Sequence, residues 1–474
     1  MSELPAGWVS ASIGEICSQG EQRIPEADEQ FTYIDIASVD RGRKRVMGPQ
    51  LLRGYEAPSR ARKVVATGDV IVSMTRPNLN AVALIGQRHD SAIASTGFDV
   101  LRPIEVDPRW IFAAVKSAHF VKAMSAKVQG ALYPAIKADD IRKHEIPLPP
   151  LAEQKRIAQK LDALLAQVDT LKARIDAIPA LLKRFRESAL SAAVSGRLTK
   201  SHDKTRHLAE PFRLNDGAQP ASAEETSQAI EVTGEPFPDQ WTIYALEQIV
   251  DGERGISYGI VQTGDPVAEG VSTVRCGDVR HLRIDTTALK VVARDIEKNY
   301  ARTRLKGGEV LLAIRGSIGN TAVAPKSLAN CNISREVAMI PCIEDVDSMF
   351  VALVLQSKRG QQLLAGKTRG VAQKGINLAD VRRLPIALPS RTAQREIVDR
   401  VEQLFTYADQ LEAKVAAAKQ RIDALTQSLL AKAFRGELVP QDPTDEPASA
   451  LLERIRAQRA ATPKPKRGRK AATS

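Results

Sequence analysis

Cysteines, long apolar runs and secretion signals are scarce or missing in this chain of 474 residues. The four cysteines show no CxxC spacing, and no run of about 18 apolar residues occurs. These absences exclude a disulfide framework, a paired-cysteine zinc site and a membrane-spanning helix. The N-terminus also lacks the charged and then apolar pattern of a signal peptide. We therefore expect a protein of the reducing cytoplasm that has no membrane association.

Motifs of enzyme active sites are missing as well. The sequence contains no HExxH, no GxSxG, no paired Cys/His ligand set, and no Asn-Pro-Pro-Tyr/Phe or Asp-Pro-Pro-Tyr/Phe tetrapeptide of an amino-methyltransferase. The segment Gly360–Thr368 resembles a P-loop, but five residues separate its glycines where the motif has four, and a helical pattern precedes it. We predict a chain that is not an enzyme and that holds no cofactor or metal.

The charge of the chain is positive and unevenly distributed. The formal net charge is +12, which points to a polyanionic partner such as double-stranded DNA. Residues 41–63 carry eight Lys or Arg against one acidic residue, and residues 451–474 have the same ratio. Further basic clusters lie at 274–306 and 358–383. Any one cluster could instead be an ordinary solvated face.

The chain contains an internal repeat at a constant offset of 240 residues. A two-copy chain is a built-in pseudo-dimer, and a pseudo-dimer suits a target that itself has two parts. Matching elements include Gly68-Asp69-Val70 with Gly308-Glu309-Val310, Gln154 with Gln394, Gly196 with Gly436 and, at an offset of 233, Pro5-x-x-Trp8 with Pro238-x-x-Trp241.

Each copy opens with a segment of mixed strand and helix pattern. Short apolar runs separated by Gly, Pro and Asn predict strands, and an amphipathic stretch after them predicts a helix. This pattern predicts two globular domains of the α+β class. The expected strands are Phe31–Val39, Val70–Met74, Ala81–Ile85 and Phe98–Leu101, then Val271–Cys276, Val310–Ile314, Thr321–Ala324 and Glu336–Ile340; the expected helices are Pro108–Ala126 and Val346–Ala365.

A heptad period follows each domain and is typical of a coiled coil. Because the two copies share register and length, we expect the helices to pair with each other, although each could pack on its own domain. A pseudo-two-fold relation makes this pairing antiparallel with the domains at opposite ends, so that the helices act as a ruler. Pro179 predicts a kink or local break. The expected seam residues are Ile157, Leu161, Leu164, Val168, Leu171 and Ile175, then Ile397, Val401, Leu404, Leu411, Val415 and Ile422.

These changes of pattern divide the chain into six parts. The part between the copies is rich in Ser, Glu, Ala, Gln and Gly without an apolar period, which is typical of a surface linker. The expected parts are a globular domain at 1–150, a helical region at 151–198, a linker at 199–236, a second domain at 237–390, a second helical region at 391–438, and a short helix with a disordered basic tail at 439–474.

Three pairs of loops carry the side chains best suited to DNA. Arg can grip guanine, Asn can grip adenine, and both Lys and Arg bind phosphates. The frame of these loops matches between the copies while the side chains differ, which predicts two unlike half-sites; ordinary hairpin turns are the alternative. The candidates are Arg41, Arg43, Lys44, Arg45, Arg76, Asn78, Asn80, Gln129, Tyr133 and Lys137, then Arg275, Arg280, His281, Arg283, Arg315, Ser317, Asn320, Lys367, Arg369, Gln373, Lys374 and Asn377.

A set of motifs in fixed order marks both copies. Leu4-Pro5-x-x-Trp8 and Phe237-Pro238-x-x-Trp241 open the domains, and Ile146-Pro-Leu-Pro-Pro150-Leu-Ala-Glu-Gln154 and Ile386-Ala-Leu-Pro389 with Gln394 precede the helices. Phe434-Arg-Gly-Glu-Leu438 closes the second copy, where the first has Val194-Ser-Gly-Arg-Leu198. In this order, and over essentially the whole chain, the motifs resemble the specificity subunits of type I restriction-modification systems.

The resemblance implies two target-recognition domains that each bind one half of a bipartite, asymmetric DNA site, and helices that set the gap between the halves. It implies that the helices dock two modification subunits that methylate adenine, and that ATP-driven restriction subunits join the assembly. S-adenosylmethionine, ATP and Mg would then belong to the partner subunits only. The docking surface is expected on outer helix faces, which could instead be ordinary solvated faces, at residues such as Glu153, Lys155, Arg156, Arg395, Glu396 and Glu402.

Two other classes of function stay open at this point. The chain could be a stand-alone regulator that binds a split DNA site without methyltransferase partners. It could also be a degenerate nuclease or an ATP-dependent enzyme, for which the near-P-loop is the only hint. Full affinity of the isolated chain for specific DNA would favour the regulator, and ATP binding by the isolated chain would favour the enzyme.

Overall fold

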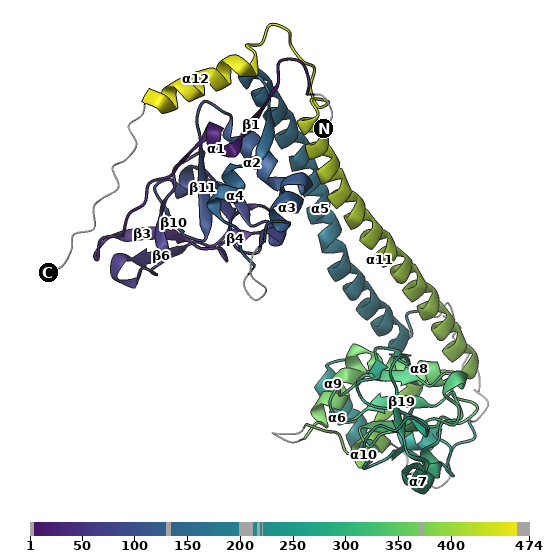
Figure 1. Ribbon diagram of the computed structural model, residues 1–474. Helices are drawn as coiled ribbons and strands as arrows, with labels where there is room; N and C mark the ends of the chain where they lie inside the picture. The colour runs from purple at the N-terminus through teal and green to yellow at the C-terminus, as the bar shows by residue number, and fades with distance from the viewer. Residues whose placement is uncertain are drawn as a thin grey trace, which may run out of the picture. The chain divides into compact units, whose positions relative to one another are not determined.

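The structure is a computed structural model that describes residues 4–128, 134–198, 212–215, 219, 221–369 and 374–461. The chain separates into two compact units, Met1–Asp176 with Ala416–Ser474 (unit 1) and Ala177–Val415 (unit 2). Each unit holds one globular domain and parts of both long helices (Figure 1). Among the described helices, none is long and apolar enough to cross a membrane.

The domain of unit 1 is built around two four-stranded sheets. Its strands are β1 (Val9–Ser12), β2 (Cys17–Gln19), β3 (Gln30–Ile34), β4 (Val39–Asp40), β5 (Arg45–Val46), β6 (Gln50–Arg53), β7 (Ala61–Val64), β8 (Val70–Ser73), β9 (Val82–Leu84), β10 (Ile93–Ser95), β11 (Phe98–Pro103) and β12 (Glu145–Leu148); its helices are α1 (Ile13–Ile16), α2 (Pro108–Lys116), α3 (Ala118–Ser125) and α4 (Ala138–Arg142). The sheets have the strand orders β6-β3-β10-β7 and β2-β11-β8-β9, and β1-β12 and β4-β5 form separate pairs. The strand β8 is buried along its whole length and packs against α2, so the core lies between them.

The domain of unit 2 repeats this arrangement. Its strands are β13 (Thr242–Ala245), β14 (Ser257–Tyr258), β15 (Val271–Val274), β16 (Val279–Arg280), β17 (Arg283–Ile284), β18 (Lys290–Val292), β19 (Val310–Ala313), β20 (Thr321–Val323), β21 (Asn332–Ile333), β22 (Val337–Ile340) and β23 (Pro385–Leu388); its helices are α6 (Ala223–Thr233), α7 (Arg294–Glu297), α8 (Ser348–Gln356), α9 (Lys358–Gly366) and α10 (Leu378–Arg382). The order β14-β22-β19-β20 matches β2-β11-β8-β9, while β18-β15-β21 has three strands where unit 1 has four. The α+β class is therefore confirmed in both copies.

A serine divides the helix that the sequence predicts as continuous in each domain. The stretch Pro108–Ala126 forms α2 and α3, and Val346–Ala365 contains α8 and all of α9 except its last residue. Ser117 and Ser357 lie between the helices with extended backbone, and each hydroxyl oxygen accepts the backbone N–H three residues further on, at 3.2 and 3.1 Å. Such a cap starts a new helix. The prediction of one helix is wrong in both copies.

The strand predicted over Phe31–Val39 is also wrong in its extent. The strand β3 ends at Ile34, because Asp35 accepts hydrogen bonds from the backbone N–H (2.8 Å) and hydroxyl (2.7 Å) of Ser38. Carboxylates that bond to the backbone a few residues ahead stabilise turns and compete with regular structure.

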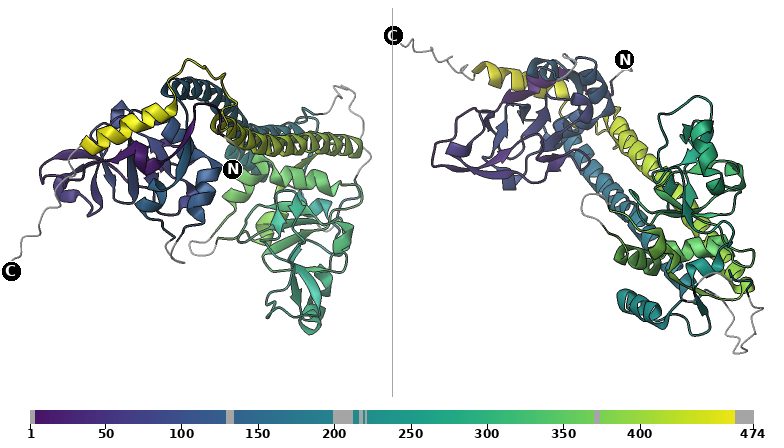
Figure 2. Two further views of the ribbon diagram at one scale, coloured as in Figure 1. Left: turned by 45° about the horizontal axis from the view of Figure 1, so that its top comes forward. Right: turned by 90° about the horizontal axis from the view of Figure 1, so that it is seen from below.

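The long helices α5 (Leu151–Val194) and α11 (Arg391–Phe434) lie side by side within each unit (Figures 1 and 2). Residue numbers fall along one helix as they rise along the other, so the pairing is antiparallel. The ion pairs are Lys172 with Asp423 (3.3 Å) and Asp176 with Lys419 (2.7 Å) in unit 1, and Arg186 with Asp409 (2.6 Å) and Glu412 (2.9 Å) in unit 2.

Burial along these helices follows most of the predicted seam. The buried members are Ile157, Leu161, Val168, Ile397, Val401, Val415 and Ile422, while Leu164, Ile175, Leu404 and Leu411 are partly buried. Leu171 is 48% exposed, which corrects its assignment to the seam. Lys172 beside it is partly buried and pairs with Asp423 of α11. Pro179 lies inside α5, which continues through it, so of the predicted kink or local break the break is not found.

Aromatic side chains form the contact between the C-terminal end of α11 and the domain of unit 1. Phe434 packs on Trp110 with 4.5 Å between ring centroids, and Trp110 meets Trp8 edge-on at 5.7 Å. Edge-on and tilted contacts of this kind add stability beyond the area they bury.

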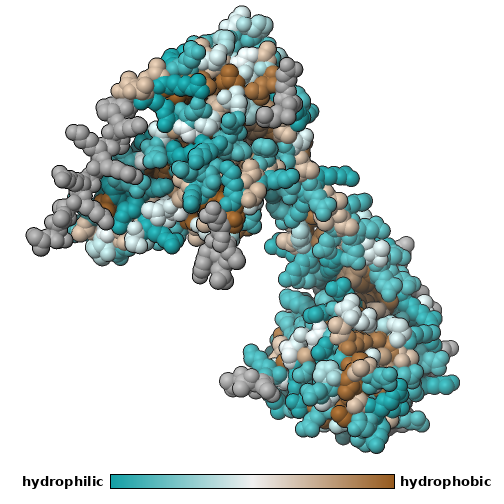
Figure 3. All heavy atoms as spheres, in the orientation of Figure 1, coloured by the Kyte–Doolittle hydropathy of each residue, from teal (hydrophilic) through white to brown (hydrophobic). Residues whose placement is uncertain are grey.

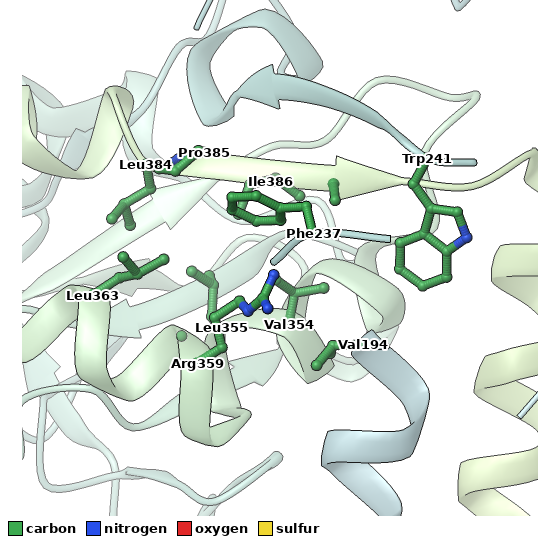
Figure 4. Close-up of a pocket in the computed structure, with 12 residues that line it drawn as sticks. Val194, Phe237, Trp241, Val354, Leu355, Arg359, Leu363, Leu384, Pro385 and Ile386 are labelled. Atoms are coloured by element: carbon green, nitrogen blue, oxygen red, sulfur yellow. The ribbon is translucent and has the colours of Figure 1, made fainter. Parts of the chain in front are cut away.

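At the corresponding contact in unit 2, between the C-terminal end of α5 and the domain, the side chains are smaller than in unit 1. By the repeat, Phe350 stands in place of Trp110 and Val194 in place of Phe434. Trp241 meets Phe350 at 5.7 Å. The Arg359 guanidinium lies 4.5 Å above the centre of the Phe237 ring, inside the pocket in Figure 4.

The segment after each long helix folds onto the domain of the same unit. The helix α12 (Ala448–Ala461) packs against α1 and β1 of unit 1 (Figure 2), and its Arg454 pairs with Glu105 at 2.8 Å. In unit 2, α6 lies against α9 and β23, with Glu225 paired to Arg383. A helix therefore lies inside the segment 199–236, where the sequence has no apolar period.

Candidate nucleic-acid interface

The first group of candidate residues in unit 1 lies on the hairpin β4–β5. The Oδ1 atom of Asp40 accepts the backbone N–H groups of Arg43 (2.9 Å) and Gly42 (2.8 Å), and these bonds hold the pKa of Asp40 below its usual range. Arg41, Arg43 and Arg45 are exposed. The carboxylate therefore shapes a tip that presents three arginines to solvent.

Lys44 is turned inward, unlike these arginines. Its Nζ donates a hydrogen bond of 2.6 Å to the backbone oxygen of Asn80. Burial, followed by the positive charges of Lys116 and Arg41, lowers the pKa of Lys44 to about 8. Lys44 thus joins the hairpin to the next loop instead of extending freely toward a phosphate.

The second group lies between β8 and β9, around a short 3-10 helix at Pro77–Leu79. Arg76 and Asn78 are exposed, whereas Asn80 is only 9% exposed. Arg76 and Asn80 both adopt left-handed backbone, each with φ of 47°. Non-glycine residues seldom take this conformation, and where they do they often lie at functional sites.

Backbone contacts place the third group of candidate residues, on the segment that contains Lys137, beside the loop between β8 and β9. Thr75 forms a bridge with Ala135, and the N–H of Arg76 donates to the oxygen of Pro134 at 2.8 Å. Lys137 follows this bridge and is exposed. Three segments that are far apart in the sequence thus form one surface in unit 1, which we call cluster 1 (Arg41, Arg43, Lys44, Arg45, Arg76, Asn78 and Lys137).

The hairpin β16–β17 takes the place of β4–β5 in unit 2. Arg280 and Arg283 stand directly opposite each other in it, and His281 lies between them; all three are exposed. Like charges at paired positions destabilise a hairpin. A bound anion would relieve this repulsion, so the pair suits a phosphate contact.

Two hydrogen bonds join this hairpin to the following loop. The Nδ2 of Asn320 donates to the backbone oxygen of Val279 at 3.0 Å, and the N–H of Leu282 donates to the oxygen of Thr321 at 2.9 Å. The Asn320 amide therefore has a structural partner, which leaves it less suited to a base contact than the sequence predicts.

In unit 2, backbone contacts place the third group of candidate residues beside the loop between β19 and β20. Arg315 forms a bridge with Gly375, and Lys374 and Asn377 on that segment are exposed. Arg369 is exposed and lies 3.4 Å from Asp380. We call this surface cluster 2 (Arg280, His281, Arg283, Arg315, Arg369, Lys374 and Asn377).

The remaining candidates divide into three kinds. Arg275 is paired with Asp278, with 3.3 Å between Nε and Oδ2, although its side chain is 43% exposed. Ser317 and Lys367 are partly exposed. Gln129, Tyr133 and Gln373 lie outside the described residues. On the face drawn in Figure 3, hydrophilic side chains predominate over both domains.

Sequence reasoning missed what Gln154 and Gln394 do. Both are fully buried, and each ties the start of its long helix to its domain. The Oε1 atom accepts the N–H of Asp107 or Asp347 at 2.9 Å, and Nε2 donates to the proline oxygen five residues earlier at 2.8 or 3.0 Å. The recurrence of the glutamine at the repeat offset was the available signal.

Two residues expected on the outer helix face have other roles. Glu153 is buried and accepts a hydrogen bond from Nε1 of Trp8 at 2.9 Å, and burial raises the pKa of its carboxyl group. Arg156 pairs with Asp445 at 2.6 Å. The prediction of exposed docking residues is therefore wrong for Glu153, because a tryptophan 145 positions away covers it.

A family model described as the type I restriction modification DNA specificity domain matches residues 5–180 and 274–418. The EcoBI specificity subunit from Escherichia coli is 38% identical over 360 residues, which are 74% of this chain and 72% of that protein. The EcoKI specificity subunit, also from Escherichia coli, is 30% identical over 99% of both chains.

Solved structures show a similar fold. One chain from a study titled "Structural basis underlying complex assembly and conformational transition of the type I R-M system" has a TM-score of 0.72 and 26% identity, and the match covers 92% of this chain and all of that one. The HsdS subunit from Thermoanaerobacter tengcongensis has a TM-score of 0.58 at 26% identity, over 92% of this chain and 98% of its own.

Proposed function

The chain belongs to the family of type I restriction-modification DNA specificity subunits, and on this premise we propose how its surfaces carry out that function. It is a non-catalytic DNA-recognition subunit that binds DNA and assembles with other subunits of a restriction-modification system. We place it in the cytoplasm, where its DNA target and its partner subunits would be found.

We propose that cluster 1 and cluster 2 each bind one half of a bipartite, asymmetric DNA site. The observation that carries this proposal is that three separate loops meet in each unit on matching scaffolds with unlike side chains. Arg76 and Asn78 of unit 1, and Arg315 and Asn377 of unit 2, suit guanine and adenine edges in the major groove. The arginines of the two hairpins suit phosphates, which fix position and make affinity depend on salt.

The long helices fix the spacing between the half-sites, and we propose that they also dock two adenine-methyltransferase subunits. Lys155, Arg395 and Glu402 are exposed on them and suit such a contact. Restriction subunits would join through this assembly. In this proposal S-adenosylmethionine, ATP and Mg²⁺ are bound by the partner subunits.

The test is co-purification with the modification subunit expected from a neighbouring gene, followed by single-molecule sequencing of DNA methylated by the complex. We expect methyl-adenine confined to one split, non-palindromic sequence, and no such pattern with the modification subunit alone. If no complex forms while the isolated chain binds a split site with full affinity, the stand-alone regulator would be the correct function.

A further inference from the structure

The hairpin and the neighbouring loop are joined by different bonds in the two units. In unit 1 the donor is a charged side chain of the hairpin, the Nζ of Lys44, and the acceptor is the backbone oxygen of Asn80 on the loop, at 2.6 Å. In unit 2 the donor is an amide of the loop, the Nδ2 of Asn320, and the acceptor is the backbone oxygen of Val279 on the hairpin, at 3.0 Å. Asn80 and Asn320 are equivalent in the repeat, so the direction of the bond is reversed.

The loop between β8 and β9 in unit 1 has a more strained backbone than the equivalent loop in unit 2, so it depends more on a stabilising hydrogen bond. Arg76 and Asn80 both have φ of 47°, and Lys44 itself has φ of 53°. Gly316 and Gly319 supply the positive φ angles of the loop in unit 2, at 65° and 90°. Because glycine takes these angles without steric cost, the loop of unit 2 is relaxed, while that of unit 1 is held in place by its surroundings.

We infer that Lys44 is a positioning residue for recognition of the first half-site, and that its ammonium group makes reading by cluster 1 dependent on pH between 7 and 9, where cluster 2, whose His281 is already neutral, is not. This inference rests on the proposed function. Lys44 holds the carbonyl of Asn80 and thereby fixes the exposed side chains of Arg76 and Asn78 on the same loop. The corresponding amide of Asn320 does not titrate.

The surroundings of Lys44 set the pH at which this dependence appears. Asp40 and Arg41 face it from the hairpin and Lys116 from α2, and burial is the main cause that lowers its pKa to about 8. Above that pH the bond to Asn80 changes from charge-assisted to neutral and weakens. Burial disfavours the charged form, so deprotonation removes a penalty on the folded state. A loss of recognition at pH 9 would therefore not come from a destabilising effect of Lys44 deprotonation on the fold.

The experiment uses the complex with its modification subunit and three duplexes: the methylated target sequence, the same duplex with the first half scrambled, and one with the second half scrambled. Discrimination is the ratio of affinities for intact and scrambled duplexes. For the wild type we expect first-half discrimination to fall by about fivefold between pH 7 and pH 9, the worth of about one weakened hydrogen bond. Second-half discrimination should stay constant and serves as an internal control.

Three variants separate positioning from charge. Lys44→Met should lose about tenfold of first-half discrimination at pH 7 and lose its pH dependence. Lys44→Arg should restore part of the discrimination and keep it at pH 9. Arg43→Met, next to it on the exposed tip, should weaken binding to all three duplexes alike.

Two outcomes would overturn the inference. Lys44→Met with wild-type first-half discrimination at both pH values would show that the bond does not position the loop. A pH dependence of equal size in both halves would show that the dependence does not arise at Lys44. A wild-type complex that does not distinguish the three duplexes at all would instead contradict the proposed function and remove the ground of the inference.

Discussion

Unit 1 and unit 2 attach their domains to the long helices through the same bonds, but different bonds shape the loops that we propose to bind DNA. Gln154 and Gln394 have equivalent partners at nearly equal distances. Lys44 and Asn320, which hold the loops, differ in charge and in the direction of the bond. The comparison teaches that the repeat preserves the scaffold while the recognition surfaces diverge, as two unlike half-sites require.

The largest expected effect comes from shortening both helices together. Deleting residues 169–175 and 420–426, which face each other in the antiparallel pair, removes one heptad, or about 10 Å, from each helix. We expect both half-sites to be retained and the gap between them to shrink by about three base pairs. Sequencing of DNA methylated by the complex measures this. An unchanged gap would contradict the role of the helices as a ruler, and deletion in one helix only should abolish the complex.

The helix ends should show the next largest difference between the units. Phe434→Ala should destabilise unit 1 by about 3 kcal/mol, because it removes an aromatic ring from the contact with Trp110. Val194→Ala removes far less volume and should destabilise unit 2 by about 1–2 kcal/mol. Hydrogen exchange of β1 and β12 compared with β13 and β23 measures the two effects separately. Equal losses would mean that the divergent helix ends are energetically equivalent.

Equal effects are expected where the copies agree. Gln154→Ala and Gln394→Ala each leave a backbone N–H and a buried proline oxygen without their partner, which should cost about 2 kcal/mol in each unit. The matched pair is its own control when exchange is measured in both units. A clearly larger loss of stability in one unit would show that the two glutamines contribute unequally despite their equivalent hydrogen bonds.

The smallest expected effects belong to the ion pairs between the helices. Lys172→Ala in unit 1 and Arg186→Ala in unit 2 should each cost less than about 1 kcal/mol, because the partner carboxylates are mostly exposed. Arg186 contacts two carboxylates, so its replacement should cost slightly more. Thermal unfolding at low and high salt tests this order, and a cost that is independent of salt would argue against a Coulombic origin.

The repeat, the α+β class and the antiparallel helices could be predicted because each leaves a periodic or duplicated pattern in the sequence. The breaks at Ser117 and Ser357 could not, because serine fits a helix interior or a cap and only the surrounding fold decides which. Most of the predicted seam residues are buried or partly buried, and Leu171 is the exposed exception.

For the candidate interface, the sequence predicts which loops carry basic and amide side chains but not how single side chains are oriented. Arg76 and Lys44 have similar charge and lie in similarly basic segments, yet one is exposed and the other is turned toward Asn80. The sequence predicts Glu153 as a surface residue of a helix, whereas Trp8 covers it in the fold. Contacts between residues so far apart in the chain leave no local pattern.

The packing of α12 has a consequence for the order of events during synthesis. The N–H of Ala448 donates to the oxygen of Gly7 at 3.0 Å, and the apolar residues of α12 complete the core around Trp8 and Trp110. Domains usually fold in the order in which the ribosome releases them. Here the core of the first domain is completed only when α12, the last helix, has been translated. A ribosome that stops before α12 therefore releases a chain whose second domain is complete and whose first domain is not.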